Sequence, residues 1–255
     1  MSLIGIIASS KLGDNRPDSP VSGYYMWFDG ADTSTITSSS GFVSQWNDKS
    51  ANALHISQSG GNTTKPETGV NTLNSKNVLK WDETGGVRGL FRANPAGLQS
   101  DPNMTIFVVA NYKTGGVGTW GYAASLGFGD DQASPSGVIA YNGVFQRSNG
   151  YLYGIGGNGR IVSVNSDQRD TWKIYILSKS GTTTTAYFNK TSQGTASGSY
   201  SISSYRFAVG FLPQNPGGNY AFNGDIAEIL VYTSALSTTD RELNVDYLQK
   251  KWALS

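Results

Sequence analysis

The chain has 255 residues, with 19 basic and 18 acidic side chains and no cysteine. This charge balance gives no strong attraction to nucleic acid or to an anionic membrane surface, so neither is an expected partner. The lack of cysteine excludes disulfides, thiolate catalysis and thiolate metal sites. A single all-β domain can reach this length. The 32 glycines and 14 tyrosines are typical of short strands joined by tight turns.

Residues 1–20 form a predicted N-terminal arm, and residues 21–255 form one predicted domain. The arm begins with a short apolar run without a basic flank, too short for a signal peptide or a membrane span. Such a run must be buried by the domain or by another chain. We expect it to dock on a neighbouring subunit by strand addition, through Leu3, Ile4, Ile6 and Ile7.

Turn-bounded runs of strand-forming residues follow the arm and favour a two-sheet antiparallel sandwich. The run 226–232 is apolar in both phases except at Glu228, which is typical of a central strand. Because an unpaired buried carboxylate is costly, we expect Glu228 to be paired or exposed at an edge. The predicted strands are 24–28, 41–46, 78–81, 104–112, 172–177, 182–188, 205–212 and 226–232.

One helix is predicted at the C-terminus. Ser237 and Asp240 have the spacing of a capping box, with Asp in place of the usual Glu. We expect the helix to pack on a sheet edge with one face, and Leu243 and Tyr247 to lie toward the other side. The packed face consists of Val245, Leu248 and Trp252.

Two blocks of sequence carry a resemblance to a known family. The first, residues 24–58, contains a W-x-D strand end and a V-x-x-W-N-D-K-S turn, and the second runs from N-G-D-I-A-E to the final K-W. Together they resemble the laminin-G-like, concanavalin A-like jelly-roll domains of phage virion proteins and bacterial surface proteins. The middle of the chain, 85–218, matches only in its strand rhythm.

The resemblance implies an all-β, two-sheet antiparallel jelly-roll sandwich with one C-terminal helix and an extended N-terminal arm. We interpret its motif residues as structural. Tryptophans bury a large area and find a partner for the indole N–H, and short polar residues cap turns at strand ends. These residues are Trp27, Asp29, Trp46, Asp48, Glu228 and Trp252.

Some relatives with this fold are glycoside hydrolases, which use two carboxylates around the scissile bond. The E-x-D-x-x-E strand pattern is absent, and the spacing of Asp225 and Glu228 would place them on opposite faces of a strand. His55 is the only histidine, and no G-x-S-x-G elbow accompanies it. We therefore predict no enzymatic activity and no catalytic residue.

Carbohydrate binding is the leading functional hypothesis for the middle segment, since sugars stack their apolar faces on aromatic rings. The alternative is that these rings fill the core or an interface. Candidate sugar-binding residues are Trp120, Tyr122, Tyr141, Tyr151 and Tyr153. Calcium is a candidate cofactor at Asp130 and Asp131, because it prefers loop oxygens. The alternative at that position is a solvated acidic turn.

The main functional prediction is a phage virion structural protein, either a head decoration or fibre protein or a tail-fibre component. It would be made in the host cytoplasm without a signal peptide and displayed on the particle surface. Its partners would be other virion subunits or copies of itself, with a trimer as one candidate, and host glycans. The first alternative is a lectin-like carbohydrate-binding module of a bacterial surface protein, and a carbohydrate-active enzyme is less favoured.

Overall fold

The computed structural model describes residues 14–58, 61, 65–82, 89–93, 96–98, 103–113, 120–128, 141–147, 152–156, 160–164, 169–197, 205–211 and 222–255. The predicted docking residues Leu3, Ile4, Ile6 and Ile7 lie outside these ranges, as do Asp130, Asp131 and Tyr151.

The strands of the first layer pair antiparallel around two long central strands, β8 (Met104–Tyr112) and β17 (Gly224–Tyr232). Strands β1 (Met26–Asp29) and β6 (Lys76–Trp81) lie one after the other along the same edge of β17. In spatial order the layer contains β15 (Thr191–Ser197), β14 (Thr183–Phe188), β13 (Trp172–Ser180), β8 (Met104–Tyr112), β17 (Gly224–Tyr232), and then β1 (Met26–Asp29) and β6 (Lys76–Trp81).

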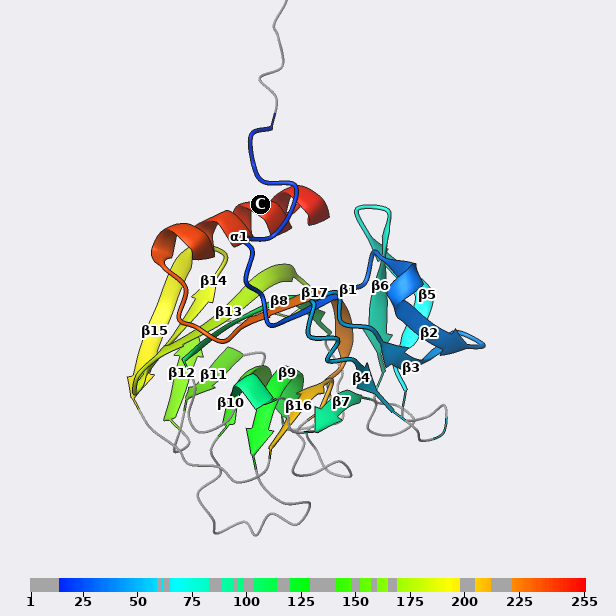
Figure 1. Cartoon of the computed structure of the whole chain (residues 1–255), viewed down its shortest axis with the longest axis horizontal. Helices are drawn as coiled ribbons and strands as arrows, with labels where there is room; N and C mark the ends of the chain where they lie inside the picture. Colours follow the sequence, from blue (N-terminus) through cyan, green and yellow to red (C-terminus); the bar gives the residue numbers. More distant parts are fainter. Residues whose placement is uncertain are drawn as a thin grey trace, which may run out of the picture.

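The second layer is also antiparallel and lies below the first in Figure 1. It contains β7 (Leu90–Ala93), β16 (Tyr205–Val209), β9 (Trp120–Phe128), β10 (Tyr141–Arg147), β11 (Leu152–Gly156) and β12 (Arg160–Val164). Short strands connect the layers on one side, namely β5 (Glu67–Leu73), β3 (Phe42–Trp46) with its hairpin partner β2 (Ile36–Ser39), and β4 (Ile56–Ser57).

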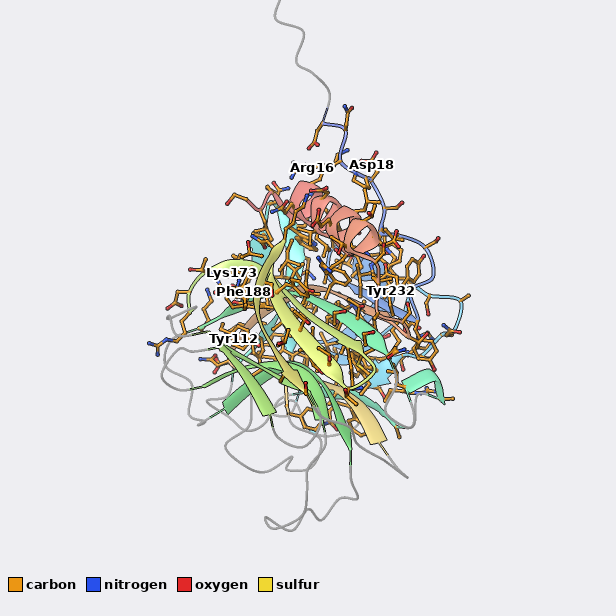
Figure 2. All side chains as sticks on the ribbon, turned by 90° about the vertical axis from the view of Figure 1, so that its left-hand side faces the viewer. Arg16, Asp18, Tyr112, Lys173, Phe188 and Tyr232 are labelled. Atoms are coloured by element: carbon orange, nitrogen blue, oxygen red, sulfur yellow. The ribbon has the colours of Figure 1, made fainter. Side chains whose placement is uncertain are left out.

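A core of buried side chains fills the space between the layers. Phe28 of β1 stacks on Phe207 of β16 with ring centroids 6.0 Å apart, which joins the two sheets directly. Farther along, the ring of Tyr175 lies 5.3 Å from the rings of both Tyr112 and Phe188, two residues labelled in Figure 2. The predicted two-sheet antiparallel sandwich is confirmed.

Helix α1 (Thr238–Trp252) covers the outer face of the first layer (Figure 1). Ser237 caps it by accepting a hydrogen bond from the Asp240 N–H at 3.1 Å, as the capping-box spacing predicted. The helix packs on side chains from β13, β8 and β17 in a second buried cluster. The predicted position on a sheet edge is therefore wrong, because β8 and β17 are apolar on both sides and require cover on the outer face as well.

The inward face of the helix is wider than its periodicity indicated. Tyr247, predicted to lie on the other side, is buried with Leu248 against the sheet, whereas Leu243 is 38% exposed. Residues 14–21 cross the helix on its outer side, and Arg16 and Asp18 lie beside it in Figure 2. Lys250 holds this segment by contacts of 2.8 Å to the Arg16 carbonyl and 2.8 Å to Asp18.

Candidate functional site

The strand register sorts the positions of the second layer onto two faces. Phe207 and Val209 of β16 belong to the core between the layers, and they lie directly opposite Leu126 and Ala124 of β9. Because directly opposite residues share a face of an antiparallel sheet, Leu126 and Ala124 occupy core-side positions.

A β-bulge in β9 then reverses the alternation. Val144 of β10 pairs with Ala124, whereas the next residue, Phe145, pairs with Tyr122, so that Ala123 is the extra residue. Without the bulge, Trp120 and Tyr122 would share the core side with Leu126 and Phe128. With the bulge, the Trp120 and Tyr122 positions lie on the face that points away from the core.

Aromatic positions of three neighbouring strands gather on this outer face. Tyr122, Phe145 and Tyr153 lie directly opposite one another on β9, β10 and β11, a row that spans about 10 Å at ordinary strand spacing. Tyr141 shares the face because it lies two positions before Gly143 and four before Phe145 on β10. We call the positions of Trp120, Tyr122, Tyr141, Phe145 and Tyr153 the aromatic face.

Two arginine positions accompany the aromatic face. Arg147 lies opposite Trp120, and Arg206 of β16 lies opposite Gly127, which in turn lies opposite Tyr141. The register therefore places both arginine positions on the same face as the aromatic positions. These residue types can stack on apolar faces and bind carboxylates.

A second group of polar and charged side chains lies beneath α1, where another bulge directs Glu228 toward the helix. Strand β8 pairs Ala110 with Ile226 and Val109 with Glu228, and thereby skips Ala227. Glu228 consequently shares a face with Val109, which is buried under the helix. Asp225 also lies on this face, because it pairs with Asn111, two positions from Val109. The expectation that Asp225 and Glu228 lie on opposite faces is wrong, since it assumed an unbroken alternation.

Glu228 is completely buried, and both of its oxygens accept hydrogen bonds. Oε1 accepts one from Trp27 Nε1 and one from the Tyr247 hydroxyl, each at 2.7 Å. Oε2 accepts one from Trp252 Nε1 at 2.7 Å and contacts Lys251 Nζ at 2.8 Å. The carboxylate therefore connects β1, β17 and α1, and Glu228 is paired, which was one of the two expectations.

Asp29 and two lysines extend this buried group, which we call the Glu228 cluster. Asp29 lies directly opposite Glu228 across β1 and β17, and Lys251 Nζ contacts Asp29 Oδ1 at 2.7 Å. Lys49 Nζ contacts the other oxygen of Asp29 at 2.9 Å and Asp32 at 2.9 Å. Two carboxylates that face each other would repel, and Lys251 between them offsets this repulsion.

Burial raises the pKa of Glu228, and the charge of Lys251 acts in the opposite direction. Burial also raises the pKa of Tyr247, with the neighbouring Glu228 carboxylate adding to the effect. The Tyr247 hydroxyl therefore stays protonated and remains available to donate to Glu228.

Asp48 organises the turn after β3. Its Oδ1 accepts hydrogen bonds from the N–H groups of Trp27 and Ser50, each at 2.8 Å. Its Oδ2 accepts bonds from the Ser50 hydroxyl at 2.6 Å and the Leu54 N–H at 2.8 Å. His55 belongs to this turn through its Nδ1, which accepts the Asp48 N–H at 3.1 Å. A carboxylate with four donors holds a loop in place and offers little to a substrate.

The predicted tryptophan anchors differ from one another. Trp46 and Trp252 are fully buried, whereas Trp27 is partly exposed and packs beneath the helix. Trp46 Nε1 has no hydrogen-bond acceptor among the described residues, which differs from the expected pairing of its indole N–H. The same is true of Trp81 Nε1, on β6. Their burial in the apolar core stabilises the fold by area alone.

Within the described ranges, no group of three or more histidine, aspartate or glutamate side chains could hold a metal ion. The same part of the chain has no helix with the length and apolar character needed to cross a membrane.

The model of the concanavalin A-like lectin/glucanases superfamily matches residues 113–240 of this chain. This match includes most of the middle segment in which the sequence showed only a strand rhythm. A search of the curated proteins finds no match.

Several solved structures have a similar fold. The chain is similar to Trypanosoma rangeli sialidase in complex with 2,3-difluoro-KDN, with a TM-score of 0.61, 13% identity, and coverage of 93% of this chain and 35% of that one. A mutant of the same sialidase that displays trans-sialidase activity has a TM-score of 0.58 and 13% identity, with coverage of 92% and 34%. The CBM40 domain of Ruminococcus gnavus IT-sialidase, bound to α2,6 sialyllactose, has a TM-score of 0.47 and 15% identity, with coverage of 60% and 87%.

The prediction that the chain is not an enzyme is contradicted by these structures, because the fold occurs in sialidases and in a trans-sialidase variant. That prediction relied on a missing carboxylate pair, and sialidases use a tyrosine nucleophile instead. At 13% identity the similarity shows the fold, and the chain spans about a third of the length of these sialidases.

Half of the chain matches the family model, and the fold is the two-layer antiparallel sandwich that the sequence predicted. The chain therefore belongs to the concanavalin A-like lectin/glucanases superfamily.

Proposed function

We propose that this chain is a carbohydrate-binding domain and that the aromatic face carries the sugar. The observation that supports this proposal is the register of β9, β10 and β11. Four of the five candidate positions, Trp120, Tyr122, Tyr141 and Tyr153, lie on one face of the second layer, away from the core. Membership of a lectin and glucanase superfamily supports the same function.

The arginine positions favour an acidic glycan. Arg147 and Arg206 share the aromatic face, and a guanidinium binds a carboxylate with two parallel hydrogen bonds. A sugar that carries a carboxylate could then stack on the rings and pair with an arginine at the same time. Among the structures with a similar fold, one sialidase is described in complex with sialic acid, which is a sugar of this class.

The direct test is binding of the full chain to a glycan array with matched acidic and neutral oligosaccharides, followed by calorimetric titration of the best binder. Tyr122→Ala and Tyr153→Ala should each weaken binding at least tenfold, the effect of losing about 1.4 kcal/mol of stacking. Tyr24→Ala is the control, because Tyr24 contacts Trp27 on the first layer, with ring centroids 5.1 Å apart. An array without binders, or equal losses in all three variants, would contradict the proposal.

The charge preference has its own test. Arg147→Gln should reduce the affinity for acidic glycans and leave that for neutral glycans unchanged, whereas Arg92→Gln, at an exposed position of β7, should change neither. Equal affinity of the native chain for acidic and neutral glycans would exclude recognition of a glycan carboxylate. Carbohydrate binding itself would not be contradicted by that result.

Display on a phage particle stays a prediction from the sequence, and carbohydrate binding does not depend on it. Deletion of residues 1–12 followed by measurement of incorporation into particles tests the docking arm. Unchanged incorporation would exclude that role for the arm.

A further inference from the structure

Lys251 lies between two carboxylates in the Glu228 cluster. Its Nζ is 2.7 Å from Asp29 Oδ1 and 2.8 Å from Glu228 Oε2. The three groups come from the first strand of the first layer, the last strand and the C-terminal helix, so the tertiary fold alone brings them together. An amine, a carboxyl group and a second carboxyl group that can move a proton are the components of amide formation.

Aromatic rings enclose the amine. Lys251 Nζ lies 6.0 Å from the ring of Trp27, 5.6 Å from that of Tyr247 and 5.2 Å from that of Trp252. Glu228 is fully buried, and the side chains of Asp29 and Lys251 are 6% and 15% exposed. Charges are costly in such surroundings, so a reaction that removes one cation and one anion is favoured there.

We propose that Lys251 and Asp29 condense to form an intramolecular amide cross-link between α1 and β1, with Glu228 as the acid–base group. Glu228 takes a proton from the Lys251 ammonium, and the resulting amine attacks Cγ of Asp29. Glu228 passes this proton to the departing oxygen of Asp29, then takes a second proton from the attacking nitrogen and passes it to the same oxygen, which leaves as water. The ammonium and the carboxylate thus give one amide and one water molecule, and Glu228 ends as it began.

Two further features of the cluster support this reaction. Lys49 Nζ contacts Asp29 Oδ2 at 2.9 Å, the oxygen that remains as the amide carbonyl, and a cation at this position stabilises the negative charge of the tetrahedral intermediate. The raised pKa of Glu228 suits a group that must accept and then return a proton. Because the reacting groups are held in contact by the fold, the reaction has the advantage of an intramolecular process.

The cross-link would join the start of the domain to its end. Asp29 ends β1, and Lys251 is in the last turn of α1, so nearly the whole domain would lie within one covalent ring. Such a ring limits the unfolded chain and resists extension by force. A domain displayed on a surface benefits from both effects.

The test is the intact mass of the purified full-length chain under denaturing conditions, followed by tryptic peptide mapping. We expect the mass to be lower than the sequence mass by that of one water molecule, and residues 12–49 to be joined to residues 251–255. Lys251→Arg should show the full mass, because a guanidinium is not a nucleophile at this pH. Lys250→Arg is the matched control and should keep the cross-linked peptide, since Lys250 contacts Asp18 instead.

The mass of the native chain alone shows whether the cross-link forms, even if a variant fails to fold. Full sequence mass after prolonged incubation of the folded native chain, without a joined peptide, would overturn the proposal. Glu228→Gln tests the acid–base role, and we expect little or no cross-link in the folded variant. A cross-link that forms in that variant at the native rate would exclude Glu228 as the proton carrier.

Discussion

Replacing Glu228 by glutamine changes one oxygen of a fully buried carboxylate into an NH₂ group. All four contacts of the carboxylate are to donors, from Trp27, Tyr247, Trp252 and Lys251. The indole N–H groups and the ammonium cannot accept a hydrogen bond. Whichever way the glutamine is turned, its NH₂ group therefore meets two of these four donors, and those two contacts are lost.

The magnitude follows from these contacts. Two donors lose their acceptor, and each bond to a charged group contributes about 1.5–3 kcal/mol. Removal of one partner from a buried ion pair costs about 3–5 kcal/mol by itself. We expect Glu228→Gln to lower the free energy of unfolding by about 3–5 kcal/mol, which corresponds to a Tm lower by about 6–20 °C for a domain of this size.

The assay is urea unfolding followed by tryptophan fluorescence, on protein whose intact mass shows no cross-link, with Glu242→Gln as the control. Glu242 is on the same helix but only partly buried, so its substitution should change the free energy of unfolding by less than about 0.5 kcal/mol. A Glu228→Gln effect below about 1 kcal/mol, or one equal to that of the control, would refute the role assigned to the Glu228 cluster.

The Glu228→Gln variant also shows how the contribution of Glu228 to the free energy of unfolding depends on pH. Because burial raises the pKa of Glu228, the folded chain binds this proton more tightly than the unfolded chain does. The contribution of Glu228 to stability is then complete below its ordinary pKa of 4.5 and is lost as the pH rises through the folded-state pKa. The difference in unfolding free energy between the native chain and Glu228→Gln should therefore decrease as the pH rises above 4.5.

Three further substitutions test other contacts. Tyr247→Phe removes the hydroxyl bonds to Glu228 and Lys251 and should cost about 1.5–3 kcal/mol in urea unfolding. Gly224→Ala should cost about 3 kcal/mol, because Gly224 has a φ of +150° and a Cβ there would lie 2.1 Å from the Asn111 carbonyl oxygen. Asp48→Asn replaces an oxygen that accepts two hydrogen bonds and should cost about 2–4 kcal/mol, measured as a lower Tm.

Each of these substitutions has a control or a contradicting result. Tyr24→Phe tests loss of a tyrosine hydroxyl elsewhere on the first layer, and Gly61→Ala tests a glycine whose Cβ would meet nothing within 4 Å. Both controls should change the free energy of unfolding by less than about 0.5 kcal/mol. An Asp48→Asn protein with an unchanged Tm would contradict the role of the carboxylate in the turn.

Most of the fold could be predicted from the sequence, because hydrophobic patterns determine it. The apolar run of β17 indicated a central strand, and the predicted strand 104–112 became β8; both are buried along their whole length. The position of the helix could not be predicted, since periodicity shows which residues are apolar without showing which surface they cover. The position of Tyr247 was predicted wrongly for the same reason. Its ring is buried against the sheet, and its hydroxyl donates a hydrogen bond to Glu228.

The candidate site was harder to predict from the sequence, because two β-bulges determine which residues share a face. The extra residues Ala123 and Ala227 are ordinary strand residues, and no glycine or proline marks either position. Bulges arise from the pairing of distant strands, which a local pattern does not contain. One bulge brings the positions of Trp120 and Tyr122 to the outer face, and the other turns Glu228 toward the helix.

The most direct test of the account is a calorimetric titration of the native chain and of Tyr122→Ala/Tyr153→Ala with the best acidic glycan from the array. We expect saturable binding by the native chain, loss of binding by the double variant, and an unchanged Tm for both proteins. Equal binding by both proteins, or no glycan binding by the native chain, would contradict carbohydrate recognition on the aromatic face.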